Sequence, residues 1–163
     1  MQDNLSDIKS YYDQAVDQEQ DRLQRHQLEH DITWYYLKNY LPPEGNILEL
    51  GCGAGTITIG LAKLGYKVTA IDLSNEMVKT CKKRIIEKGL ETGVKFDVKD
   101  ARDLSGVDEY YDTVLLMGPL YHLVYKEDRE MALKQAYNRL KPGGHIFSSF
   151  ISRFGIWGDV IKK

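Results

Sequence analysis

Residues 48–56 read "LELGCGAGT", in which three glycines at alternate positions follow a short apolar run. The run Ile47–Leu50 is typical of a buried strand, and a helix is expected to begin near Thr56. Glycine adopts dihedral angles closed to other residues and lets the backbone pass close to a ligand. The free N–H groups of the following helix can hold a carboxylate or a phosphate. This stretch therefore predicts a ligand site between a strand and a helix.

The segments after the glycine loop alternate between helix and strand patterns. Strands are predicted at 67–71, 94–100, 111–118 and 145–151. Helices are predicted at 56–64, at 75–88 with Ser74 as the cap and Gly89 as the stop, and at 126–140, where the turn "KPGG" ends the helix. Such alternation gives right-handed crossovers, so the sequence predicts an α/β fold: a three-layer, doubly wound, mostly parallel sheet.

The segment before the loop has a helical pattern. Apolar residues recur at helical intervals between Leu5 and Tyr40, and Pro42–Pro43 ends the pattern because proline cannot continue a helix. One or two helices are expected, with a break near residues 13–18. A chain of 163 residues is of a length that one domain commonly has.

Composition and charge narrow the classes of function. The chain is 42% hydrophobic and 28% charged, with a formal net charge of −2, which does not favour binding to the phosphates of nucleic acids. The two cysteines, Cys52 and Cys81, have neither metal-site nor disulfide-framework spacing. The acidic N-terminus lacks the pattern of a secretory signal, and no apolar run is long enough to span a membrane, so a cytoplasmic location without membrane partners is expected.

Two classes of ligand compete for the glycine loop. A dinucleotide fingerprint has the spacing G-x-G-x-x-G, whereas here the third glycine comes one residue early and Thr56 occupies its place. The pattern E-x-G-x-G-x-G, from Glu49 through Cys52 to Gly55, instead resembles the first motif of class I S-adenosylmethionine-dependent methyltransferases. Asp72 follows the next predicted strand, where a carboxylate can accept the ribose hydroxyls of either cofactor. A nicotinamide-dependent dehydrogenase therefore remains an alternative.

The resemblance extends over roughly residues 35–151, with further motifs at the ends of the predicted strands. It implies a Rossmann-like core with strand order 3-2-1-4-5 and S-adenosyl-L-methionine as the cofactor. It also implies one domain over 1–163, with an N-terminal helical lid at 1–41 and a cofactor-binding core at 42–163. By resemblance Asp72 binds the ribose hydroxyls, and Asp100, in "KDARDL", contacts the adenine, although a turn or capping role for Asp100 is an alternative. The other cofactor contacts expected are Leu73, Met77, Ala101, Arg102 and Met117.

Aromatic residues around the element "MGPLYHL" resemble a small-molecule subgroup of the family. In this subgroup an upstream helix carries "YYD", present here at residues 11–13, and either Tyr11 or Tyr12 is expected near the sulfonium. Packing of these tyrosines onto the domain is the alternative. A nucleobase amine is disfavoured as acceptor, because Gly118 stands where such enzymes have a side-chain hydrogen-bond acceptor, although Tyr121 could still stack on a planar substrate.

Methyl transfer from a sulfonium is an in-line displacement, so the protein mainly orients the reactants and excludes water. An acceptor that must lose a proton needs a base, and His122, which follows the fourth strand, is the candidate. A structural or substrate-contact role for His122 is the alternative.

The end of the chain departs from the family pattern. Class I members usually continue past the fifth strand, whereas this sequence ends with "FGIWGDVIKK", so a truncated C-terminus is expected. An open fifth strand at 146–151 would need cover from a second copy, as a homodimer, or from residues 152–163. The prediction is methyl transfer to a small-molecule acceptor. The alternative is a cofactor-binding or interaction module without turnover.

Overall fold

Five parallel strands form the centre of the computed structural model, which describes residues 4–14 and 27–151. They are β1 (Asn46–Leu50), β2 (Lys67–Asp72), β3 (Val94–Val98), β4 (Tyr111–Leu116) and β5 (Leu140–Ser148). The order across the sheet is β3-β2-β1-β4-β5, which confirms the predicted doubly wound topology. The strand order reverses on either side of β1, and such a reversal is where open α/β sheets bind ligands.

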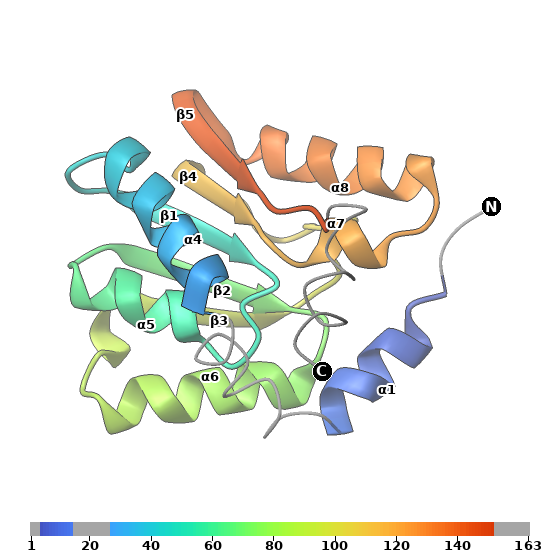
Figure 1. Ribbon diagram of the computed structural model, residues 1–163, viewed down its shortest axis with the longest axis horizontal. Helices are drawn as coiled ribbons and strands as arrows, with labels where there is room; N and C mark the ends of the chain where they lie inside the picture. The colour runs from blue at the N-terminus through green and yellow to red at the C-terminus, as the bar shows by residue number, and fades with distance from the viewer. Residues whose placement is uncertain (1–3, 15–26, 152–163) are drawn as a thin grey trace.

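Helices cover both faces of the sheet (Figure 1). They are α1 (Ser6–Gln14), α4 (Gln27–Tyr40), α5 (Thr56–Lys63), α6 (Asn75–Glu87), α7 (Pro119–His122) and α8 (Lys126–Asn138), with the 3-10 helix η1 (Glu91–Gly93) before β3. Buried side chains of α4, α5 and α6 form one core with one face of the sheet, whereas α7 and α8 form a second core with the other face. The three predicted layers are therefore present.

The central strands are almost wholly buried because helices pack on both of their faces. In β4 five of the six residues are buried, as its continuous apolar sequence indicates. The cap predicted for α6 is also confirmed: Ser74 has extended backbone, and its hydroxyl accepts a hydrogen bond from the N–H of Met77 at 3.1 Å. These local signals fix where β2 ends and α6 begins.

The prediction for the start of the fifth strand is wrong. The segment "KPGG" lies within β5, and the preceding helix ends at Asn138. The pairing of β5 with β4 shifts between Tyr111 and Thr113, so that Pro142, Gly143 and Gly144 lie in an irregular part of the strand. Such an irregularity accommodates a proline that cannot donate to the ladder. The segment after Gly118 contains the short helix α7.

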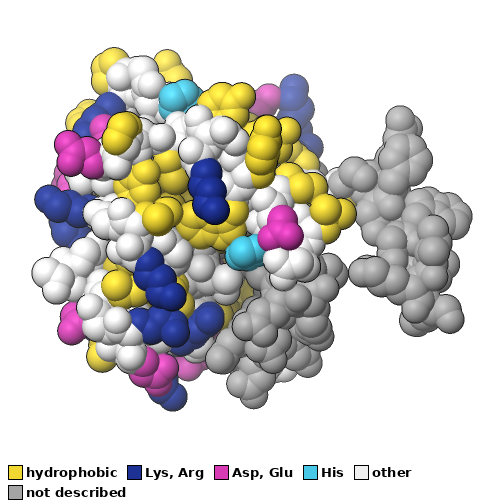
Figure 2. All heavy atoms as spheres, turned by 60° about the vertical axis from the view of Figure 1, so that its left-hand side comes forward, with side chains coloured by type: hydrophobic (Ala, Val, Ile, Leu, Met, Phe, Trp, Pro, Cys, Tyr) yellow, Lys and Arg dark blue, Asp and Glu magenta, His cyan; other side chains and the backbone are white. Residues whose placement is uncertain are grey.

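One side of α4 packs on the sheet and its other side remains exposed. Leu37 is fully buried, whereas Tyr35, Tyr36 and Tyr40 are more than half exposed. Figure 2 shows hydrophobic side chains gathered on this part of the molecule, with charged side chains of both signs among and around them. None of the helices in the described ranges is long and apolar enough to cross a membrane.

Candidate active site

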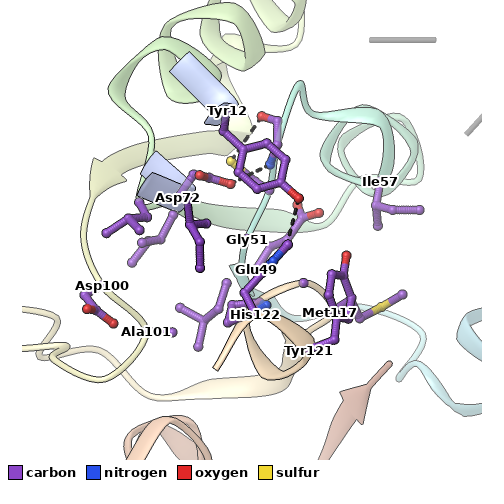
Figure 3. Close-up of a pocket in the computed structure, with 18 of the residues that line it drawn as sticks. Tyr12, Glu49, Gly51, Ile57, Asp72, Asp100, Ala101, Met117, Tyr121 and His122 are labelled. Carbon is purple, nitrogen blue, oxygen red and sulfur yellow. Dashed lines mark hydrogen bonds between the residues drawn. The ribbon is translucent and has the colours of Figure 1, made fainter. Parts of the chain in front are cut away.

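A cavity opens at the carboxyl ends of β1, β2 and β4, where the topology places a ligand site. It contains about 1200 Å³ of empty space, including open solvent at its mouth. We call the part of its lining that comes from the ends of β1 and β2 and from the glycine loop the floor: Glu49, Gly51, Cys52, Gly53 and Asp72. We call the side chains that face it from α7, from α1 and from Leu5 just before α1 the roof: Leu5, Ile8, Tyr12, Tyr121 and His122. Figure 3 shows floor and roof residues converging on the cavity.

The three glycines of the loop serve different purposes. All have positive φ, at 84° for Gly51, 51° for Gly53 and 82° for Gly55. A Cβ on Gly53 would meet no atom within 4 Å, so this position faces open space in the cavity. A Cβ on Gly55 would lie 2.4 Å from Cys81 Sγ. Gly55 is therefore required for packing of the loop against α6, and it does not line the cavity as expected.

The Asp72 carboxylate is held in a fixed orientation at the end of β2. Its Oδ2 accepts from the N–H of Gly53 at 2.8 Å, and its Oδ1 accepts from the N–H of Ser74 at 2.9 Å. Burial raises the pKa of Asp72, and the hydrogen bonds from the backbone oppose this by favouring the charged form. Each carboxylate oxygen has a second lone pair, so Asp72 can still accept hydroxyl groups from a ligand.

Glu49 lies deeper in the floor and is only 4% exposed. Burial raises its pKa to about 8, although a hydrogen bond from the hydroxyl of Thr58, at 2.6 Å, favours the charged form. The buried position of Glu49 therefore favours its neutral form. A cationic group in the cavity would favour its ionisation.

Lys99, Asp100 and Ala101 line the cavity after β3, and Leu73 lines it after β2. Asp100 also accepts from the N–H and the guanidinium of Arg102, so the turn role considered from the sequence is present beside the cavity position. Arg102 itself does not line the cavity as expected, because its guanidinium bridges Asp100 and the buried carboxylate of Asp128. Its contribution is to fix the orientation of Asp100.

The roof joins two distant parts of the chain. The hydroxyl of Tyr12 in α1 lies 2.7 Å from Nε2 of His122 in α7, and Figure 3 shows this contact across the cavity. The ring of Tyr121 contacts that of His122 at a centroid distance of 4.6 Å. Of the two adjacent tyrosines considered, Tyr12 lines the cavity, whereas Tyr11 is 56% exposed and lies outside it.

The sulfur-containing residues expected at the site fall into two groups. Cys52 and Met117 line the cavity. Met77 is fully buried in α6 and does not line the cavity. Within the described ranges, no group of three or more His, Cys, Asp or Glu side chains could hold a metal ion.

Several residues that line the cavity were not predicted from the sequence. Among them are Leu5 just before α1, Ile8 of α1, Glu29 and Thr33 of α4, Ile57 of α5, and Lys99. Leu5, Ile8 and Tyr12 have the spacing of one helix face, and this period is the signal that predicts a common position for their side chains. Nothing in the sequence of α4 shows that Glu29 and Thr33 face the cavity, since this depends on how α4 packs across the sheet.

A protein-family model described as "Methyltransferase domain" matches residues 47–144, from β1 into β5, a range that includes the whole floor. The chain belongs to the S-adenosylmethionine-dependent methyltransferases. Gly53 fits this cofactor, since its open space allows a ligand against the backbone, and so does the oriented carboxylate of Asp72, which suits a ribose.

Individual methyltransferases resemble the chain over most of its length. The putative methyltransferase YqeM of Bacillus subtilis is 34% identical over 74% of this chain and 48% of its own. The ubiquinone biosynthesis O-methyltransferase of Xanthomonas axonopodis pv. citri is 34% identical over 72% of this chain and 48% of its own. This methyltransferase chain thus spans about half the length of the curated relatives it matches.

Solved structures of methyltransferases show the same fold. A SAM-dependent methyltransferase from Methanosarcina mazei has 30% identity and a TM-score of 0.66, covering 73% of this chain and 58% of its own. The glycopeptide N-methyltransferase MtfA, in complex with S-adenosyl-L-homocysteine, has 25% identity and a TM-score of 0.65, covering 73% of this chain and 51% of its own.

Proposed function

We propose that this chain binds S-adenosyl-L-methionine on the floor of the cavity and transfers its methyl group to a small-molecule acceptor beneath the roof. The observation that carries the proposal is the pairing of Gly53, whose missing side chain faces open space, with the Asp72 carboxylate that its own N–H orients. This arrangement leaves room for a ligand against bare backbone and aims a charged acceptor at its hydroxyl groups.

Each part of the floor has a proposed role. Asp72 binds the ribose hydroxyls, while Leu73, Asp100 and Ala101 surround the adenine. The loop from Gly51 to Gly53 and the Glu49 carboxyl lie toward the amino-acid end. When bound, the cofactor supplies a methyl group on a positively charged sulfur, ready for in-line displacement. The protein therefore contributes orientation and exclusion of water rather than a nucleophile.

The roof is the proposed acceptor side. His122 is the base that removes a proton from a hydroxyl or amine acceptor, with Tyr12 in contact with its Nε2. The rings of Tyr12, Tyr121 and His122, together with Met117, offer an apolar wall for the acceptor. Named relatives include both an O-methyltransferase and an N-methyltransferase, so this similarity alone leaves the acceptor atom open.

We also propose that a second copy covers the open edge of β5. In the described residues β5 pairs only with β4, and Phe150 and Ile151 after it are exposed. A ring contact between Tyr40 and His145 joins this edge to the exposed aromatic side of α4. Sedimentation should show a concentration-dependent dimer. A monomer at all concentrations would contradict the proposal.

Titration calorimetry with S-adenosyl-L-homocysteine tests the cofactor site. The substitution Gly53→Val should weaken binding at least about a hundredfold while the fold persists, because a branched side chain would occupy ligand space and resist positive φ. Gly106→Val is the matched control, since Gly106 also has positive φ, at 79°, and open space around it. Equal affinities in the two folded variants would remove the loop from the site.

A methyl-transfer assay over a panel of hydroxyl and amine metabolites then tests turnover. Transfer to one acceptor, reduced in His122→Ala with cofactor affinity retained, is the expected result. Cofactor binding without transfer to any acceptor would support a binding module instead.

A further inference from the structure

The helix α1 has little intrinsic reason to form where it does. It has nine residues and no buried side chain, and isolated helices of this length are marginal in water. Asp13 lies in its last turn, where the helix dipole disfavours a negative charge, and that turn has no basic residue. Lys9 pairs with Asp13 at 2.7 Å, but with the cation on the N-terminal side, which is the weaker order. Contacts with the rest of the protein must therefore hold α1.

Polar contacts join α1 to both sides of the cavity. At one side the hydroxyl of Tyr12 meets His122 of α7, as described above. At the other side the hydroxyl of Ser74 donates to Oδ1 of Asp13 at 2.5 Å. A hydrogen bond to a carboxylate is stronger than one between neutral groups. Asp13, unfavourable for its own helix, thus has a favourable partner in a different element.

Ser74 is almost completely buried and connects three parts of the structure. Its hydroxyl caps α6 by accepting from the N–H of Met77, and the same hydroxyl donates to Asp13 of α1. Its own N–H donates to Asp72 Oδ1, on the carboxylate proposed to bind the ribose. One residue therefore links the roof helix α1 to the key side chain of the floor.

The charge of Asp13 also suits its position beside α6. Hydrogen bonds from Lys9 and from Ser74 lower the pKa of Asp13, and the backbone N–H of Glu76 lowers it further. Glu76 lies in the first turn of α6, where the helix dipole favours a negative charge. The charge of Asp13 is thus favoured by its position beside the first turn of α6.

We infer that Asp13 and Ser74 are positioning residues whose hydrogen bond fastens α1 over the cavity and ties its closure to Asp72. Opening of α1 breaks the bond between Asp13 and Ser74 while the cap on α6 persists. Closing of α1 places Leu5, Ile8 and Tyr12 in the cavity lining. Occupation of Asp72 by a ribose keeps Ser74 in place and so favours the closed position. This last link depends on the proposed function, whereas the fastening itself does not.

Amide hydrogen exchange of a peptide covering Ser6–Gln14 tests the fastening in the unliganded protein. Asp13→Ala should increase the exchange rate about tenfold, the scale expected for loss of a charged hydrogen bond. Asp7→Ala is the control, because it removes the same charge from an exposed site in the same helix. Alanine is a better helix former than aspartate, so faster exchange in Asp13→Ala cannot come from intrinsic propensity.

Stopped-flow release of S-adenosyl-L-homocysteine tests the link to the floor. Asp13→Ala should release it about tenfold faster than the wild type, and Asp7→Ala less than about threefold faster. Equal exchange rates of α1 in the two variants would overturn the fastening. Faster exchange with unchanged release would overturn the link to Asp72. A wild-type protein that does not bind this ligand would overturn the proposed function, and the unliganded exchange would still decide the fastening.

Discussion

The floor and the roof of the cavity are held in different ways. The floor is continuous with the hydrophobic core: Glu49 and Cys52 are buried, and the backbone N–H groups of Gly51 and Cys52 donate to the carbonyl of Ile71 in the adjacent strand. In the roof, α1 has no buried residue, and described polar contacts join its residues Tyr12 and Asp13 to α7 and Ser74. A fixed floor and a loosely held roof suit a site that must retain one ligand and admit another.

This difference reflects which contacts are local in the chain. The floor arises from the end of β1, the loop directly after it and the neighbouring strand β2, whose register with β1 pairs Leu50 with Ile71. The roof requires Tyr12 to meet His122, a residue 110 positions away. Contacts between distant segments must offset the entropy of closing a long loop. We therefore expect the roof to open at a lower free energy than the floor.

The largest effect is expected from Gly55→Ala, in the glycine loop that carries Gly51, Cys52 and Gly53 of the floor. The new Cβ would lie 2.4 Å from Cys81 Sγ and 3.3 Å from Cys81 Cα, at a φ of 82°. Overpacking and left-handed strain together should lower the free energy of unfolding by about 2–5 kcal/mol. Gly65→Ala is the control, because Gly65 has φ of 89° and no atom within 4 Å of a Cβ.

Urea denaturation of both variants measures this effect. Gly65→Ala should lose about 1–2 kcal/mol from strain alone. If the two variants lose the same amount, the contact with Cys81 contributes nothing, and the floor is less tightly packed than the comparison requires.

The sequence was sufficient to predict the floor because its signals are local. Glycines after an apolar run, an acidic residue at the end of the next strand and a serine cap correctly predicted where the loop lies, where β2 ends and where α6 begins. Each signal reports what the backbone needs within a few residues. The alternation of strands and helices then sufficed for the sheet order, since crossovers are right-handed.

Spacing alone could not say which side chain faces the cavity. Tyr11 and Tyr12 are neighbours on one helix and point in directions about 100° apart, so only the docking of α1 selects Tyr12. Gly55 and Arg102 lie beside lining residues but are directed to Cys81 and to Asp128, partners from distant segments. The turn "KPGG" was placed before the fifth strand because proline and glycine usually end elements, whereas the irregular pairing with β4 accommodates them.

The floor residue Glu49 should give the protein a distinctive pH dependence. Burial raises its pKa from 4.5 to about 8, so the folded state binds this proton more tightly than the unfolded state. The resulting stability is present below about pH 4.5 and is lost as the pH rises toward 8. Glu49→Gln cannot lose a proton, and it should exceed the wild type in stability by on the order of 4 kcal/mol at pH 8.5.

Thermal unfolding at pH 5.5 and pH 8.5 compares Glu49→Gln with the wild type and with Glu87→Gln, a change on the exposed surface of α6. The difference between Glu49→Gln and the wild type should be small at the lower pH and large at the higher one. Glu87→Gln should follow the wild type at both. An identical pH response in all three proteins would show that Glu49 is ionised in the folded protein, and the floor would then be better solvated than its burial indicates.

The smallest effect is expected in the roof, from Tyr12→Phe. The substitution removes the hydroxyl that contacts His122 Nε2 and keeps the ring, so the free energy of unfolding should fall by only about 0.5–1.5 kcal/mol. Tyr11→Phe is the control, because this adjacent side chain is exposed, and its change should stay within about 0.5 kcal/mol. Urea denaturation measures both.

A loss in Tyr12→Phe as large as that in Gly55→Ala would mean that the roof is built into the cooperative core, and the contrast between a fixed floor and a movable roof would fail. A small loss confined to Tyr12 would place the roof among the elements that open while the sheet remains folded, since a helix without buried side chains depends on a few polar contacts.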